Sequence, residues 1–163
     1  MKAIHDLPEP HSKVLELLIA RISPAEHLWG LTGSAGLRLQ GVDIPVHDLD
    51  LQTDARTIYL LEQELAEFVQ VPVHVWETEH TRSHHGQAEI DGLQVEFLGD
   101  VRHRGVNGEW ESPLDIRSIL VWVEWHGLSI PVLSLAHEAL AYAKMGRTEK
   151  AERISAVLQR GNL

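Results

Sequence analysis

Residues 33–50 read GSAGLRLQGVDIPVHDLD, and this stretch decides the fold of the chain. Gly33-Ser34 predicts a tight turn, with Ser34 as the N-cap of a short helix that ends near Gly41. Asp48 and Asp50 then alternate with leucines, which is the period of a β-strand. Residues i and i+2 of a strand face the same way, so we expect the two carboxylates to project together.

Paired carboxylates of this kind need a positive charge nearby, because like charges a few ångströms apart repel. A divalent cation supplies that charge, and Mg²⁺ prefers one or two carboxylates completed by phosphate oxygens and water. The backbone amides at the Gly33-Ser34 turn suit a phosphate group. The stretch therefore predicts a metal site beside a phosphate site, the alternative being that Asp48 and Asp50 lie on a solvated strand face.

The rest of the chain predicts an α/β (α+β) domain in the order αβαβαβ, then two hairpins, then two helices. Asp91-Gly92 suits a two-residue type I′ turn between alternating segments, and the segments on either side of His126-Gly127 indicate a second hairpin. Residues 80–85 are polar and are predicted as a loop. The expected strands are 27–31, 47–53, 72–78, 87–90, 93–99, 119–125 and 128–133. The expected helices are a first helix capped by Ser12, 55–68 capped by Asp54, 134–145 with Leu135, Ala139, Leu140 and Ala143 inward, and about 148–158.

Length and composition indicate one domain, residues 1–163, with a core over about 12–133 and C-terminal helices over about 134–160. The formal net charge of −10, from 24 acidic and 14 basic residues, argues against a broad grip on extended nucleic acid, which needs clustered Lys and Arg. The absence of cysteine excludes disulfides and thiolate metal sites. With no apolar signal or membrane span in the sequence, we expect a cytoplasmic protein.

Gly-Ser followed by Asp-hydrophobic-Asp resembles the signature of the polymerase-β-like nucleotidyltransferases, with a gap between Ser34 and Asp48 at the long end of the family's range. The resemblance implies a mixed sheet flanked by helices, with a helical C-terminal tail. It also implies transfer of an NMP from an NTP, such as ATP, to a hydroxyl-bearing acceptor, with two Mg²⁺ ions held by three carboxylates. Gly33 and Ser34 would then contact the triphosphate, and Asp48 and Asp50 would hold the metals.

The family's third carboxylate lies on a later strand, where Glu96 in LQVEFLGD is the candidate. Glu96 would be a metal ligand, a general base toward the acceptor hydroxyl, or both. It stands where the family more often has Asp. Glu89 and Asp100 are alternatives, and a surface residue on the hairpin is the competing interpretation.

The run AYAKMGRTEK, residues 141–150, resembles the tail of small bacterial members, where basic residues approach the nucleotide. Lys144, Arg147 and Lys150 are therefore candidate triphosphate ligands. The alternative is that they complement the dipole at a helix end.

The other polar and aromatic clusters favour structural roles. The loosely spaced His80, His84, His85 and His103 lack a spacing such as HExxH and indicate an exposed polar loop rather than a zinc site. His47 is expected to be structural. Trp122 and Trp125 lie on opposite faces of a predicted strand, so one belongs to the core and the other is free for a partner or a homodimer contact.

Two functions follow from these predictions. The first is an enzyme whose acceptor is a small molecule, a protein or an RNA end, and a cationic aminoglycoside would suit a carboxylate-rich pocket. The second is a nucleotidyltransferase-like antitoxin or regulatory module that acts through a protein partner. A degenerate member that binds nucleotide without turnover is a third, against which the intact Asp48 and Asp50 pair argues.

Overall fold

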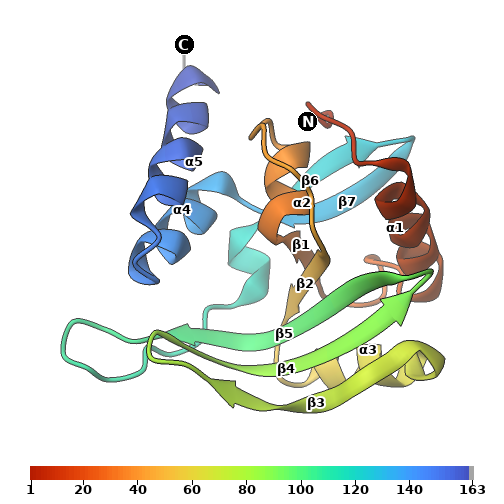
Figure 1. Ribbon diagram of the computed structural model, residues 1–163, viewed down its shortest axis with the longest axis horizontal. Helices are drawn as coiled ribbons and strands as arrows, with labels where there is room; N and C mark the ends of the chain where they lie inside the picture. Colours follow the sequence, from red (N-terminus) through yellow and green to blue (C-terminus); the bar gives the residue numbers. More distant parts are fainter. Residues whose placement is uncertain (162–163) are drawn as a thin grey trace.

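The strand that carries Asp50, β2 (Leu49–Thr53), lies in the middle of a mixed seven-stranded sheet in the computed structural model, which describes residues 1–161 (Figure 1). The predicted domain's residues 162–163 lie outside the described part. From edge to edge the strand order is β3-β4-β5-β2-β1-β7-β6. β2 pairs in parallel with β5 and β1 in parallel with β7, whereas the other neighbours are antiparallel.

The remaining elements match the predicted order and confirm the α+β class with a helical tail. The strands are β1 Gly30–Thr32, β3 Val69–Glu77, β4 Thr81–Ile90, β5 Leu93–His103, β6 Leu120–Trp125 and β7 Leu128–Leu133. The helices are α1 Glu9–Arg21, α2 Gly33–Leu39, α3 Thr57–Glu64, α4 Leu135–Lys144 and α5 Thr148–Gly161, with short 3₁₀ turns at Ala66–Phe68 and Ile116–Ile119.

Alternation along β2 separates the core from the site. Leu49 and Leu51 are fully buried on one face of the strand, whereas Asp50 is only half-buried on the other. The buried face packs into the main core with α1, through residues such as Leu15 and Leu18. Burial of such leucines stabilises the fold by roughly 1.5–3 kcal/mol each, so the core determines which way Asp50 points.

A second, smaller core attaches the C-terminal helices. Leu37 of α2 and Ile44 of the following connection pack against Tyr142 of α4 and Ile154 of α5. Figure 1 shows α4 and α5 side by side at the edge of the molecule, beyond α2. The tail therefore docks on the same 33–50 stretch that carries the aspartates.

Both predicted hairpins are confirmed. Asp91 and Gly92 have φ values of 52° and 77°, and His126 and Gly127 have 49° and 76°. A type I′ turn requires positive φ at both central residues, which Gly accepts freely and Asp tolerates.

Trp122 and Trp125 behave as a pair on opposite faces of β6. Trp125 is buried and its Nε1 donates to Asp6 Oδ1 at 2.8 Å, whereas Trp122 is exposed on the edge strand. A homodimer contact through Trp122 stays a prediction.

The predicted loop at residues 80–85 is wrong, because Thr81–His85 forms the start of β4. The segment pairs with β3 on one side and with β5 on the other. Ser83 and His85 are buried on one face although both are polar. Backbone pairing with β3 and β5 holds this segment as a strand. The sequence did not predict it, because its side chains are polar and lack the apolar alternation that indicates a strand.

Two predicted caps also need correction. α1 begins at Glu9 after Pro8, and Ser12 lies inside the helix with its hydroxyl donating to the Leu7 carbonyl at 3.3 Å. Proline suits the first turn, where backbone N–H groups need no helical partner. α2 begins at Gly33, so Thr32 rather than Ser34 occupies the N-cap position.

α3 begins at Thr57 with Arg56 at the N-cap position, later than predicted, and Asp54 accepts from the Thr57 N–H at 2.6 Å. The helix also ends earlier than predicted, and Leu65 leads into a 3₁₀ turn. No helix within residues 1–161 has both the length and the apolar character needed to cross a bilayer.

Candidate active site

Parallel pairing of β2 with β5 sets Asp50 directly opposite Glu96. Their neighbours Leu51 and Phe97, also paired, are buried in the core. Because side chains alternate along a strand, the two carboxylates must lie together on the opposite face. Asp48 lies one residue before β2 and is half-buried.

The two facing carboxylates have opposite electrostatic environments. Burial raises the pKa of Asp50 to about 7, and the nearby charges of Glu96, Asp48 and Glu138 add to the shift. The pKa of Glu96 is lowered, first by the His85 imidazole, whose Nε2 lies 3.9 Å from Glu96 Oε2, and also by the Gln94 amide, which donates at 2.8 Å. The site thus concentrates negative charge that a cation would relieve.

The residues fit a divalent cation delivered with a nucleotide. Asp50 Oδ1 is buried and accepts no hydrogen bond from the described residues, which leaves an oxygen ligand without a partner. Within residues 1–161, no three His, Asp or Glu side chains are already gathered around one ion position. Mg²⁺ needs only one or two carboxylates when phosphate oxygens and water complete its shell.

Gly33 is required where it stands. Its φ is +65°, and a Cβ at this position would collide with Asp50 Oδ2. The absence of a side chain therefore lets the first residue of α2 pack directly against the carboxylate.

Ser34 links this turn to the aspartates. Its Oγ accepts from the His47 N–H at 3.2 Å, while the His47 carbonyl lies 2.7 Å from His11 Nε2. The backbone of His47 is thus held on both sides, by Ser34 and by His11, in line with its expected structural role. These contacts fix the position of the neighbouring Asp48 backbone.

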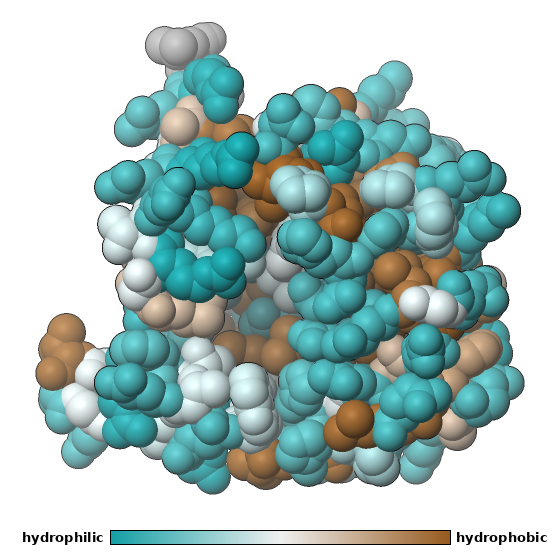
Figure 2. Space-filling view, in the orientation of Figure 1, coloured by the Kyte–Doolittle hydropathy of each residue, from teal (hydrophilic) through white to brown (hydrophobic). Residues whose placement is uncertain are grey.

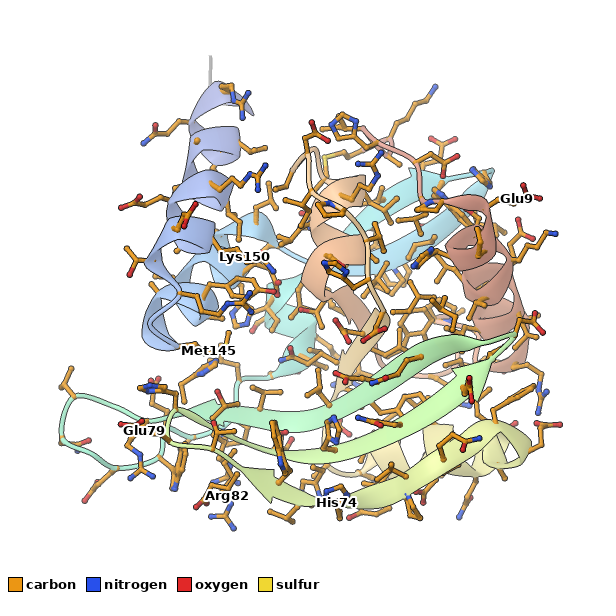
Figure 3. The ribbon with its side chains drawn as sticks, viewed as in Figure 1. Glu9, His74, Glu79, Arg82, Met145 and Lys150 are labelled. Atoms are coloured by element: carbon orange, nitrogen blue, oxygen red, sulfur yellow. The ribbon has the colours of Figure 1, made fainter. Side chains whose placement is uncertain are left out.

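The basic residues of the tail divide into two groups. Arg147 and Lys150 both lie over the ring of Tyr142, with Lys150 Nζ 4.5 Å from its centroid. Burial lowers the pKa of Lys150, while the charges of Glu138 and Asp50 oppose the shift, so Lys150 lies within electrostatic reach of Asp50. Figure 3 shows Lys150 on the side of α5 that faces α2. Lys144 instead pairs with Glu111 at 3.0 Å.

Two adjoining hollows share Arg147. A cleft of about 450 Å³ lies between the sheet and the C-terminal helices, and its lining includes Gly33, Asp50 and Glu96. A second hollow, of about 590 Å³, is lined by Ser34, Arg147, Lys150 and Arg153, among others. The two hollows are thus lined by the predicted site residues other than Asp48, which lines neither. Arg153 lines the second hollow without having been predicted.

Glu138 is the main residue that the sequence interpretation missed. α4 buries Leu135, Glu138 and Tyr142, whereas Leu140 and Ala143, predicted inward, are exposed. Glu138 Oε1 accepts from Thr32 Oγ1 at 2.7 Å, and burial raises its pKa to about 7. Leu135 and Tyr142 enter the second apolar core, whereas Glu138, on the same buried side, meets the Thr32 hydroxyl of β1, and apolar periodicity could not select a carboxyl group there.

The alternatives for the third carboxylate have other roles. Asp100 Oδ1 accepts from the Ala55 N–H at 3.0 Å, and Glu89 is exposed opposite Gln94. His85, predicted in an exposed loop, is buried against Glu96 and the Trp76 ring.

Replacing Gly33 tests its contact with Asp50. Gly33→Ala adds a Cβ that must displace the Asp50 carboxylate. The left-handed backbone conformation costs the alanine roughly 1–2 kcal/mol more of folding free energy, about the same in any residue with a side chain. Gly127→Ala is the matched control, since Gly127 has φ +76° and no heavy atom of the described chain within 4 Å of an added Cβ. We expect Gly33→Ala to lose more free energy of unfolding in urea, and to lose Mg²⁺–ATP affinity. Equal effects of the two substitutions would contradict the contact.

Glu138 predicts a specific pH dependence of stability. Its pKa rises from 4.5 to about 7 on folding, so the unfolded chain ionises first and stability falls as pH rises from about 4.5 to about 7. Glu138→Gln should therefore raise the free energy of unfolding at pH 8, by up to about 3 kcal/mol, and much less at pH 5. Urea unfolding at both pH values measures this, with exposed Glu149→Gln as control. A gain that is the same at both pH values would refute the shift.

The sequence and the fold both match known nucleotidyltransferases. The family described as aminoglycoside-2''-adenylyltransferase matches residues 14–157. A crystal structure from Thermotoga maritima, titled as a presumed nucleotidyltransferase, is 41% identical with a TM-score of 0.83, over 96% of this chain and 98% of that one.

A more distant structure shares the fold alone. The lincosamide antibiotic adenylyltransferase LnuA, in its lincomycin-bound form, aligns with a TM-score of 0.57 and 13% identity, over 94% of this chain and 99% of that one. Among curated proteins none matches significantly. The resemblance inferred from Gly-Ser and Asp-Leu-Asp is confirmed: this chain belongs to the aminoglycoside-2''-adenylyltransferase family of the nucleotidyltransferase superfamily.

Proposed function

We propose that this protein is a Mg²⁺-dependent enzyme that transfers the AMP group of ATP to a hydroxyl of a small-molecule acceptor. The observation that carries the proposal is the pairing of Asp50 with Glu96 in the lining of the cleft, where a buried Asp50 oxygen has no partner among the described residues. Family membership supports the adenylyl donor.

Three carboxylates would hold the metal. Asp50 and Glu96 face each other across β2 and β5, and Asp48 adds to the negative charge felt by Asp50. When bound, two Mg²⁺ ions would supply positive charge at the transferring phosphate and its leaving oxygens.

The phosphates would lie between the 33–50 stretch and the tail. Gly33 lines the cleft and Ser34 lines the adjoining hollow, so the Gly33-Ser34 turn lies between the two spaces. Arg147 and Lys150, placed by Tyr142, would neutralise phosphate charge. Lys144 lines the cleft but pairs with Glu111, so it would contact the phosphates only if that ion pair opens.

Glu96 is suited to accept the acceptor's proton. It lines the cleft and is ionised at neutral pH, although its lowered pKa makes it a weaker base than an ordinary Glu. In the transfer, the acceptor oxygen bonds to the α-phosphorus of ATP, the bond from that phosphorus to the pyrophosphate oxygen breaks, and the hydroxyl proton passes to Glu96.

The acceptor is small because the cleft is small. About 450 Å³ is within the size range of small-molecule sites. An RNA end is disfavoured by the net charge of −10. The alternative, a regulatory module acting through a protein partner, would not require ATP to bind at these carboxylates.

Calorimetry with Mg²⁺ and each NTP tests the proposal. We expect ATP to bind only with Mg²⁺. Asp48→Asn/Asp50→Asn should weaken binding beyond the roughly 10–100-fold that losing a supporting partner costs. Asp43→Asn/Asp91→Asn makes the same change of charge at exposed positions outside the cleft and should bind normally. A folded wild type that binds no NTP, or a double Asp48/Asp50 variant that binds as wild type, would sink the proposal.

A further inference from the structure

Three polar side chains that the transfer step does not use surround Glu96 on the sheet. Gln94 precedes Glu96 by two residues on β5, so both point to the same face, and Gln87 of β4 lies directly opposite Glu96. His85 of β4 lies opposite Leu98 and shares that face. We call His85, Gln87 and Gln94 the Glu96 cradle. Glu96 itself lines the cleft, which opens as the hollow between the C-terminal helices and the β4–β5 part of the sheet (Figure 2).

The cradle engages the two oxygens of Glu96 unequally. Gln94 Nε2 donates to Glu96 Oε1 at 2.8 Å, and Gln87 Nε2 contacts the same oxygen at 3.5 Å. His85 Nε2 lies 3.9 Å from Oε2, beyond the reach of a hydrogen bond. A carboxylate oxygen offers about two lone-pair positions, so the amides occupy Oε1 and leave Oε2 for a metal ion.

Packing fixes His85 in turn. Its side chain is buried, and its ring centroid lies 5.4 Å from that of Trp76 and 5.9 Å from that of His74. Both neighbours belong to the edge strand β3, where Figure 3 labels His74. The sheet therefore orders this part of the cradle without a bound ligand.

Glu96 needs such support because a glutamate side chain turns about several bonds. Ordering those bonds has an entropic cost, which weakens metal binding unless the fold has already ordered the side chain. Asp50 is shorter, and its Oδ2 lies where a Cβ of Gly33 would be. The two facing carboxylates are thus held by different means, Asp50 by close packing and Glu96 by the cradle.

We propose that His85, Gln87 and Gln94 are positioning residues, which hold the Glu96 carboxylate in place to bind the metal ion. All three lie outside the lining of the cleft, so they act through Glu96 rather than on the reacting atoms. The inference rests on the proposed function, because it takes Glu96 as a metal ligand. In the competing interpretation the three residues only fill a polar face of the sheet, and removing them changes stability but not metal affinity.

A double-mutant cycle on metal affinity tests the two amides. Mn²⁺ is titrated calorimetrically into protein with α,β-methylene-ATP, with correction for Mn²⁺ binding to the nucleotide alone. Gln87→Leu/Gln94→Leu removes both amides at similar side-chain volume and should weaken Mn²⁺ binding roughly 10–100-fold, as losing supporting partners usually does. In a Glu96→Ala background the same pair should change the affinity by less than about twofold, because no carboxylate remains to be held.

Gln63→Leu/Gln70→Leu is the matched control, since both glutamines are exposed and lie outside the cleft, and it should bind Mn²⁺ as the wild type does. Equal losses with and without Glu96 would overturn the inference, because the amides would then act independently of that carboxylate. Unchanged Mn²⁺ affinity in Gln87→Leu/Gln94→Leu or in Glu96→Ala would overturn it as well. Wild-type protein that binds no nucleotide is a separate readout, which refutes the proposed function itself.

Two variants of His85 separate positioning from packing. His85→Leu and His85→Gln both lose the ring contacts with Trp76 and His74, but only the second keeps a polar N–H beside Glu96. We expect His85→Leu to weaken Mn²⁺ binding by about tenfold and His85→Gln to restore most of the affinity. Urea unfolding measures the stability that the loss of the ring costs each variant. Equal losses of metal affinity in the two variants would overturn the role of His85.

Discussion

The parallel pairing of β2 with β5 is the constraint on which the site depends. It sets Asp50 opposite Glu96 because Leu51 and Phe97 occupy the buried face of the same register. Burial raises the pKa of Asp50 to about 7, and the charge of Glu96 adds to the shift, so the ionised pair is unfavourable without a cation. The main core therefore holds a local arrangement that its own electrostatics oppose, as is common at functional sites.

The C-terminal helices convert this carboxylate pair into an enclosed cleft. Their small core against α2 brings Lys150 within electrostatic reach of Asp50, and the Glu138–Thr32 hydrogen bond ties α4 to the end of β1. The same docking exposes Leu140 over the cleft. The basic side chains beside the carboxylates thus follow from this one packing arrangement.

The sequence predicted the parts of the site that have a local pattern. The Gly33 turn and the Asp48 and Asp50 pair were expected from motif and strand period, and Glu96 from the family resemblance, which implies a third carboxylate on a later strand. Glu138 was missed because it is a charged residue on the buried side of α4, between Leu135 and Tyr142, where an apolar period cannot find it. The strand at 81–85 was missed because its side chains are polar. It is held by backbone hydrogen bonds to a strand on each side, and these leave no pattern in the sequence.

The most direct test of the central claim is a crystal structure with Mn²⁺ and α,β-methylene-ATP. The account predicts metal bound by Asp48, Asp50 and Glu96, with the phosphates reaching Arg147 and Lys150. Metal bound elsewhere, for example at the histidines of β3 and β4, or a nucleotide outside this cleft and its adjoining hollow, would contradict it.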